Sequence, residues 1–396
     1  MNRRNFLKTA AINGTAAFLL PDMLQGRDIK TVLPPNQKIK IGQIGVTHSH
    51  AAARFRTLRK MPDIFEIVGV VDDRPTRAAW FEEQDMTPFK EADVRWMTEK
   101  ELFETPGLQA VIVETANTEL VPVSLRCMER NLAIAMDKPG GEDLKLFKKL
   151  LDGCQRRNLP FQMGYMLRTN PAIQFIQKAV RENWLGDIFE IQAGMSHNYR
   201  GEAYQQYFGQ YKAGNMFILG CHHVDWVVSL LGRPKKVTPF LGSTANALPG
   251  VKNNCRAVLE YPHAQVTIHI SDTEVDGDAN RRVKVCGTKG VIELRRLENF
   301  DGSTRRKDPN TQQETTKKPG DPDWVGLSLE LRLKEPAGGY DKGNHVVSFE
   351  TQTDRYLAQM NEFAQMVRGE IKSPYSFEHD YLAQEVFLAA CGYLKI

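Results

Sequence analysis

A short apolar strand, a tight glycine turn and an amphipathic helix follow one another between Lys38 and Arg54. A second apolar strand, Glu66 to Val71, comes next and ends in Asp72. An acidic residue about twenty positions after such a turn binds the ribose hydroxyls of a dinucleotide. The series therefore predicts a βαβ unit of the Rossmann type. Because Asp72 would repel a 2′-phosphate, the sequence favours NAD over NADP.

The glycine turn departs from the usual G-x-G-x-x-G pattern. Only the first glycine is present, as Gly45, and the second and third positions are Thr47 and His50. Thr47, His48 and His50 lie where the N-terminus of the helix would meet the phosphates. We therefore predict that their hydroxyl and imidazole groups replace the lost backbone contacts. An ordinary βαβ crossover without a nucleotide is the alternative for this stretch.

Composition indicates a globular enzyme or binding protein. The chain has 396 residues, enough for two domains, with 41% apolar and 25% charged residues. Its net charge is only +4, which argues against a nucleic-acid partner. The six cysteines form no C-x-x-C pair and lie mostly in apolar patterns, so we expect core residues, although a disulfide bridge stays open.

The N-terminus resembles an export signal of the twin-arginine type. Arg3 and Arg4 precede an apolar, small-residue run from Thr9 to Leu20. This run is too short to span a bilayer comfortably, so we expect no stable membrane anchor. Residues 1–33 are accordingly predicted to be a signal and linker, and the protein is expected in the periplasm. Export of this type carries proteins already folded around a cofactor.

Strands alternate with helices over residues 38–160, which predicts an NAD-binding domain with a parallel sheet. The third strand, residues 110–113, is followed by a turn that contains Thr115 and Asn117, and the fourth is followed by Lys138. Ligands of doubly wound folds bind at this carboxyl edge. Thr115, Asn117 and Lys138 are therefore predicted cofactor contacts.

Residues 161–396 show a different pattern, with short alternating strands that predict an α/β domain with an open, largely antiparallel sheet. Residues 198–213 are expected to form an aromatic loop, which would stack on sugar rings or serve as a lid or subunit contact. Residues 298–323 are expected to be an exposed polar loop. The predicted strands are Asp187–His197, Lys236–Leu241, Ala257–Tyr261, Gln265–Ser271, Arg282–Cys286 and Val291–Arg295.

Four motifs together resemble the glucose-fructose oxidoreductase, inositol dehydrogenase and MocA (Gfo/Idh/MocA) family. They are the glycine turn, Thr115-Ala116-Asn117, Asp137-Lys138-Pro139 and Gly220-Cys-His222-His-Val-Asp225. Two positions depart mildly from the family pattern, since Ala116 replaces a proline and Asp137 replaces a glutamate. The resemblance implies a Rossmann domain and a second domain whose open sheet covers the substrate on one face and contacts another subunit on the other.

Lys138 is the first candidate catalytic residue. It lies between a strand end and a proline at the cofactor edge, a position that holds it in place and partly removes it from water. The resemblance implies that it exchanges a proton with a substrate hydroxyl. Position alone leaves a solvated surface lysine as an equal alternative.

His222 is the second candidate. The family usually has an acid one helical turn before this histidine, but Ile218 occupies that position here. His222 is therefore predicted to act as acid or base with Asp225, at i+3, as an alternative orienting group. The predicted substrate contacts are Tyr165, Arg168, His223 and Asp225. For Arg168, an ion-pairing or capping role is the alternative.

We expect no metal site from the sequence. His48 and His50 are two positions apart, His222 and His223 are distant in the chain, and no cysteine is near them. This is not the spacing of a closed zinc site. A metal without a nucleotide would instead indicate a lyase or hydratase.

The resemblance and the export signal indicate an exported NAD-dependent dehydrogenase that acts on a secondary hydroxyl of a sugar or glycoside, with C3 of a glucoside favoured. Little free NAD exists outside the cytoplasm, so the cofactor must stay bound, with a free energy beyond about −8 kcal/mol. Redox-neutral glycoside cleavage is one alternative, but the missing acid at position 218 leaves fewer groups for its extra proton transfers. A non-catalytic carbohydrate-binding protein is the other.

Overall fold

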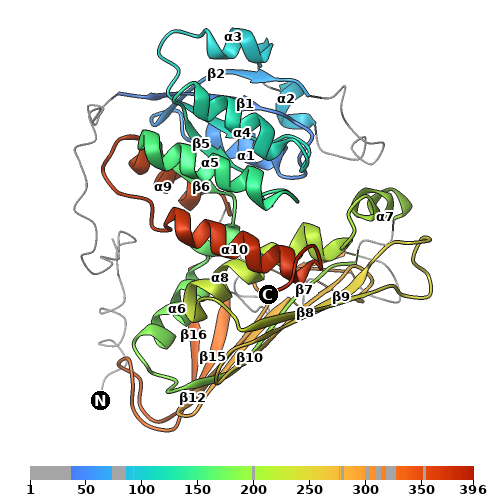
Figure 1. The fold of residues 1–396 in the computed structure, drawn as a ribbon. Coiled ribbons are helices and arrows are strands. Elements are labelled where there is room, and N and C mark those ends of the chain that lie inside the picture. Colours follow the sequence, from blue (N-terminus) through green and yellow to red (C-terminus); the bar gives the residue numbers. More distant parts are fainter. Residues whose placement is uncertain are drawn as a thin grey trace.

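The computed structural model describes residues 37–73, 86–91, 93–198, 201–275, 277, 281–298, 304–307, 314–317, 327–350 and 354–396. These residues form two units, each built on one β-sheet, and helix α10 lies between the two sheets (Figure 1). The predicted signal, a helix expected at residues 77–84, and Tyr199 lie outside the described residues.

The first sheet has six parallel strands in the order β3-β2-β1-β4-β5-β6. The strand order reverses between β1 and β4, which is where ligands of doubly wound folds bind. Strands β4 and β5 are buried apolar runs, as expected for parallel strands covered on both faces. The strands are β1 Ile39–Ile44, β2 Phe65–Val71, β3 Trp96–Met97, β4 Ala110–Val113, β5 Ala133–Met136 and β6 Phe161–Met163.

Helices cover both faces of this sheet, and one of them comes from the far end of the chain. Met360, Phe363 and Ala364 of that helix, α9, follow the i, i+3, i+4 spacing and pack against Ile41 and Ala133. Sequence order alone had grouped this helix with the second domain. The helices are α1 Ala51–Arg59, α2 Thr87–Glu91, α3 Glu99–Phe103, α4 Leu120–Glu129, α5 Leu144–Arg157 and α9 Leu357–Val367.

The second sheet has eight strands in the order β16-β15-β12-β11-β7-β10-β9-β8. All neighbours run antiparallel except β7 and β10, which run parallel. The predicted open, largely antiparallel sheet is confirmed, and β15 and β16 extend it beyond the predicted strands. The strands are β7 Ile188–Ser196, β8 Lys236–Gly242, β9 Asn254–Glu260, β10 Gln265–Ser271, β11 Arg282–Gly287, β12 Gly290–Arg295, β15 Ser328–Leu333 and β16 Gly343–Ser348.

The inner face of this sheet packs against helices, whereas the outer face is open (Figure 1). The outer face carries the exposed rings of Phe189 and Phe240 and a concavity of about 770 Å³ over β8, β9 and β10. Subunit contact through this face stays a prediction. The inner helices are α6 Pro171–Arg181, α8 Cys221–Leu231 and α10 Phe377–Ala390.

Two segments expected to be loops contain regular structure. Helix α7, Glu202–Gly209, lies in the aromatic segment, so the prediction of a loop there was wrong. Tyr204, Tyr207, Phe208 and Tyr211 follow an i, i+3, i+4, i+7 spacing, which is the period of a helix. Strands β13, Thr304–Lys307, and β14, Glu314–Lys317, pair within the polar segment.

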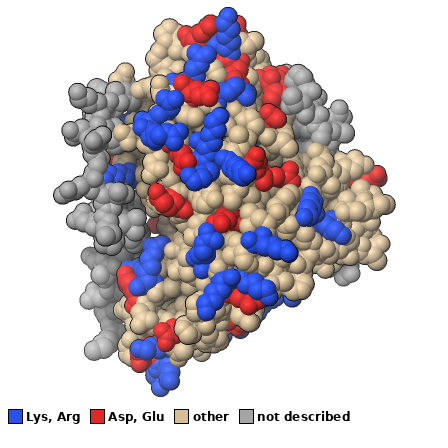
Figure 2. All heavy atoms as spheres, viewed as in Figure 1, with Lys and Arg blue, Asp and Glu red and all other residues tan. Residues whose placement is uncertain are grey.

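Charges of both signs are interspersed over the face of the molecule seen in Figure 2. Within the described part of the chain, no helix is both long enough and apolar enough to cross a bilayer. All six cysteines are buried free thiols, as expected for core residues.

Candidate active site

Strands β1, β4 and β5 are neighbours, and each is followed by a polar segment at the carboxyl edge of the first sheet. Gly45 begins the segment after β1 with a φ of +95°. A Cβ at this position would lie 2.6 to 2.7 Å from backbone atoms of Glu114 and Thr115. Only glycine therefore allows the turn to lie against the end of β4.

The turn retains donors that fit a dinucleotide. The N–H of Val46 donates to Asp73 Oδ1 over 2.8 Å, and the Thr47 hydroxyl donates to the other oxygen of the same carboxylate. The N–H groups of Thr47 and Ser49 have no hydrogen-bond partner among the described residues. Such N–H groups at a helix N-terminus bind phosphate. The turn thus fits the pyrophosphate although two of the three usual glycines are missing.

Two adjacent acids follow β2, and they differ in their contacts. Asp72, the predicted ribose ligand, is partly buried. Asp73 is the acid that bonds to the turn, and burial holds the pKa of its carboxyl above the ordinary value. Sequence spacing could not distinguish neighbouring acids, so Asp73 was missed. The ribose contact of Asp72 stays a prediction.

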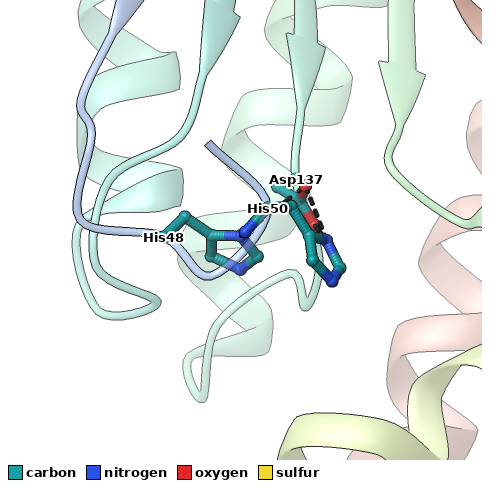
Figure 3. Close-up of side chains that lie close together, drawn as sticks. All are labelled: His48, His50 and Asp137. Atoms are coloured by element: carbon teal, nitrogen blue, oxygen red, sulfur yellow. Dashed lines mark hydrogen bonds and ion pairs between the residues drawn. The ribbon is translucent and has the colours of Figure 1, made fainter. Parts of the chain in front are cut away.

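A buried group of side chains, here called the turn cluster, lies between the glycine turn and the ends of β4 and β5. It consists of His48, His50, Arg54, Glu114 and Asp137. The Nδ1 atom of His50 lies 3.1 Å from Asp137 Oδ2 (Figure 3). The Nδ1 atom of His48 lies 3.5 Å from Glu114 Oε2 and 3.6 Å from Asp137 Oδ2. Arg54 Nε lies 3.1 Å from Glu114 Oε1. The predicted phosphate contacts of His48 and His50 stay untested, but His48 is turned inward.

Burial and mutual charge set the protonation of this cluster. Burial and the nearby Asp137 raise the pKa of Glu114 to about 7. Burial also opposes ionisation of Asp137, but His48, His50 and Arg54 outweigh it and hold that pKa well below its usual range. Burial lowers the pKa of His50 to about 3. At neutral pH, Asp137 is therefore ionised and His50 is neutral.

Lys138 is a buried lysine, only 1% exposed, so the solvated alternative does not apply. Its Nζ atom donates to the carbonyl oxygen of Ile218 over 3.1 Å. Ile218 belongs to a π-helical turn, Met216–Gly220, that continues directly into α8. The bond joins the end of β5 to the helix of the second unit that carries His222. Single π-helical turns are frequent at functional sites.

Helix α10 fixes the loop after Lys138. The side-chain oxygen of Gln384 accepts a hydrogen bond from the N–H of Gly140 over 3.1 Å, and its amide donates to the carbonyl of Gly141 over 2.6 Å. Gln384 is fully buried. No local sequence feature indicates this residue, because it lies more than two hundred positions from the loop that it holds.

His222 is buried beside Tyr165, with the two rings edge to face and 6.1 Å between their centroids. Burial, followed by the charge of Lys138, holds the pKa of His222 well below its ordinary value. Its Nδ1 atom has no hydrogen-bond partner in the described part of the chain. His222 is therefore a neutral imidazole, in which one of the two ring nitrogens is an acceptor.

Arg168 and Asp225 bind each other. Two nitrogens of Arg168 lie 3.0 and 2.6 Å from the two oxygens of Asp225, and a third contact of 2.5 Å reaches Asp380 of α10. The Nε2 atom of His379 also contacts this carboxylate and lies 2.9 Å from Asp225 Oδ1. Among the described residues, Asp225 thus has no bond to His222, and the proposed orienting pair is absent. Substrate contacts by Arg168 and Asp225 stay predictions.

The other predicted residues have internal partners. His223 is buried, accepts a hydrogen bond from Trp226 Nε1 over 3.0 Å, and has a pKa lowered to about 4 by burial. Asn117 donates to the hydroxyl of Tyr207 over 2.9 Å, which links the first unit to α7. The Thr115 hydroxyl is within 3.4 Å of the Ala116 carbonyl.

Two family models match the chain. One describes an oxidoreductase family with an NAD-binding Rossmann fold and covers residues 39–165; the other describes the GFO/IDH/MocA C-terminal domain and covers residues 173–293. The chain belongs to the Gfo/Idh/MocA family. The family resemblance is therefore confirmed, and the first unit is a Rossmann fold of the NAD(P)-binding type.

Individual relatives are distant. The trans-1,2-dihydrobenzene-1,2-diol dehydrogenase of Bos taurus is 22% identical over 204 residues, which are 49% of this chain and 57% of that protein. The chain thus matches little more than half the length of this curated relative. A solved oxidoreductase from Agrobacterium radiobacter, in complex with NAD+, L-tartaric acid and magnesium, has a TM-score of 0.69 at 14% identity and covers 91% of this chain and 98% of its own. The aldose-aldose oxidoreductase of Caulobacter crescentus has a TM-score of 0.67 at 14% identity, with coverages of 91% and 99%. At these identities the solved structures show the fold alone.

Within this Gfo/Idh/MocA fold, one further acid was missed by sequence reasoning. Strands β7 and β10 run parallel and end together, and Asp272 directly follows β10. Asp272 is fully buried, neither of its oxygens has a partner among the described residues, and burial raises its pKa to about 6. An acid placed directly after a predicted strand was the available signal.

Proposed function

We propose that this protein is an NAD-dependent dehydrogenase that oxidises a secondary hydroxyl of a sugar, polyol or glycoside. One observation carries the proposal: the buried Lys138, at the carboxyl edge of the nucleotide fold, bonds to the same helix that presents the neutral His222. The N–H groups of Thr47 and Ser49 would hold the pyrophosphate, and Asp72 or Asp73 the ribose. Nicotinamide, when bound, supplies the hydride acceptor.

The two side chains divide the proton chemistry between them. Lys138 uses one donor position on Ile218, so its ammonium can also donate to a substrate oxygen and stabilise negative charge there. The acceptor nitrogen of the His222 ring can take the hydroxyl proton because burial keeps the ring neutral. The substrate thus loses one proton to His222 and one hydride to the cofactor, and becomes a ketone.

The substrate class and the location are part of this proposal. The names of two relatives, a dihydrobenzenediol dehydrogenase and an aldose-aldose oxidoreductase, support a substrate rich in hydroxyl groups. The twin-arginine-type leader supports a periplasmic enzyme that keeps its NAD bound and regenerates it in place. The open face of the second sheet supports a homo-oligomer.

The test begins with the protein as purified. It is denatured and the released nucleotide is identified by mass spectrometry, with NAD expected. The native protein is then incubated with a simple aryl glucoside and a second sugar as hydride acceptor. A keto-glucoside with an intact glycosidic bond supports the dehydrogenase. Free aglycone without a keto product would contradict the dehydrogenase and indicate redox-neutral cleavage. If no nucleotide is released and adding NAD causes no thermal shift, a non-catalytic binding protein is favoured.

A further inference from the structure

Three groups of the kind that bind metals converge in the turn cluster. One ligand atom each from His48, His50 and Asp137 lie within 4.8 Å of one another. The Nδ1 atoms of His50 and His48 are 3.1 and 3.6 Å from the same oxygen, Asp137 Oδ2 (Figure 3). Ligands at about 2.1 Å from a tetrahedral zinc ion lie about 3.4 Å apart. We propose that these three side chains bind a divalent first-row transition metal ion.

The surroundings of His48 match those of a metal ligand. Its Nε2 atom lies 3.2 Å from the carbonyl oxygen of Lys138, which can only accept, so Nε2 carries the hydrogen. In the neutral ring the lone pair is then on Nδ1, which faces the two carboxylates. Histidine ligands usually donate their other ring N–H to a carbonyl or carboxylate, which fixes the tautomer. The 3.2 Å contact between Nδ1 and the N–H of His50 is long and would give way to an ion.

The centre of the cluster has an excess of acceptors. Nδ1 of His48 faces Glu114 Oε2 and Asp137 Oδ2 at 3.5 and 3.6 Å. Glu114 is fully buried, and neither of its oxygens has a hydrogen-bond partner among the described residues. Lone pairs that face one another in a buried site require a cation or a proton between them. Glu114 would thus stabilise the ion from the second shell, or join it as a ligand.

The buried side chains of Arg54 and Lys138 do not occupy the centre of the turn cluster. Arg54 Nε lies beside both carboxylates, 3.1 Å from Glu114 and 3.5 Å from Asp137, but neither Nε nor Nη2 of Arg54 has a hydrogen-bond partner among the described residues. The ammonium of Lys138 points to the carbonyl of Ile218 in the other unit. The side chain of His50 remains 17% exposed, which gives an ion access and a position for water. Three protein ligands with an open fourth position are the arrangement of a catalytic metal site.

The ligand atoms of a second group, Asp225, His379 and Asp380, also lie within 4.8 Å of one another, but this group is not proposed as a site. There the guanidinium of Arg168 lies between the carboxylates, 2.6 Å from Asp225 and 2.5 Å from Asp380. A cation thus already occupies the place that an ion would take. This group provides an internal control of similar composition and burial.

Two imidazoles and one carboxylate suit Zn²⁺, Mn²⁺, Fe²⁺ or Co²⁺ rather than Ca²⁺ or Mg²⁺. The test uses the full chain with a tag that contains no histidine. Metal content is measured by inductively coupled plasma mass spectrometry, both as purified and after chelation and titration with Zn²⁺. Co²⁺ substitution gives a visible spectrum that reports nitrogen and oxygen ligands. We expect one ion per chain and a rise in thermal midpoint on adding Zn²⁺.

Variants assign the ion to the cluster. His50→Ala and the nearly isosteric Asp137→Asn are expected to weaken Zn²⁺ binding by more than about 100-fold, because loss of an outer partner alone costs 10- to 100-fold. His379→Ala, in the control group, should bind as the wild type does. The proposal is overturned if the wild-type chain, which needs no substitution to be tested, binds neither Zn²⁺ nor Co²⁺. It is also overturned if His50→Ala retains wild-type affinity, or if His379→Ala loses the ion.

The measurement is separate from the proposed dehydrogenase activity. An ion that binds to a chain without NAD or turnover would support the metal site and count against the redox function. NAD and turnover in a chain that binds no ion would support the redox function alone, with a proton on Glu114 supplying the missing positive charge.

Discussion

Replacing Arg168 by methionine should destabilise the protein strongly and should do so in a pH-dependent way. The substitution removes two bonds to Asp225 and one to Asp380, and leaves two carboxylates buried, with His379 as the remaining hydrogen-bond partner of Asp225. Breaking a buried ion pair by removing one member costs about 3–5 kcal/mol. In a chain of this length, that should lower the thermal midpoint by about 4–6 °C.

The pH dependence follows from Asp225. Burial would raise the pKa of its carboxyl, but Arg168 and His379 outweigh burial and lower it to about 2. Because this is below the unfolded value of about 3.9, the ionised group stabilises the fold above about pH 4 and loses that effect as the pH falls toward 2. Without Arg168, the pKa of Asp225 rises. The difference in stability between wild type and Arg168→Met should therefore be largest near pH 7 and smaller near pH 4.5.

The assay is the thermal midpoint, read by circular dichroism from pH 4.5 to 7.5. Arg126→Met is the matched control: its partner Glu99 is 2.6 Å away, but the pair is partly exposed, so the loss should stay below about 1 kcal/mol. Adding Asp225→Asn to Arg168→Met should recover part of the loss, since the unpaired charge is gone. An Arg168→Met protein as stable as the wild type at pH 7, with KM raised, would refute this account and support the predicted substrate contact.

Three further outcomes are expected. Lys138→Met should lower kcat by about 10²- to 10⁴-fold, the usual contribution of one acid–base group; unchanged turnover would place the chemistry elsewhere. Asp73→Ala and Asp72→Ala should be compared by titration with NAD and with NADP. The residue that binds the ribose is the one whose loss lowers the ratio of NAD affinity to NADP affinity. If this ratio is unchanged in both variants, neither residue binds the ribose. Gln384→Leu should lower kcat with little change in the far-ultraviolet circular dichroism spectrum, because the loop after Lys138 loses both side-chain bonds from α10. Full activity would show that the loop keeps its conformation without these bonds.

Local sequence patterns were sufficient to predict the class of the fold. Apolar runs alternating with helical patterns predicted the parallel sheet, and period-two patterns predicted the open sheet, including β10 at its observed bounds, Gln265–Ser271. Both periods are local properties of the backbone, so they can be read without knowing what packs on each element. The same patterns placed Lys138 directly after a strand end. The alternation of Ser328–Leu333 was equally readable and was overlooked.

The way in which distant segments meet depends on tertiary packing and could not be predicted from local patterns. This packing placed α9 on the first sheet, brought Gln384 to the loop after Lys138, and satisfied Arg168 with Asp225 and Asp380 rather than leaving it free. The turn cluster has the same origin, because His48 and His50 acquire Glu114 and Asp137 only when β1, β4 and β5 lie side by side. A strand pattern fixes which face a side chain occupies but not its neighbours across the sheet. Those contacts depend on packing between segments tens to hundreds of residues apart, and local sequence does not encode them.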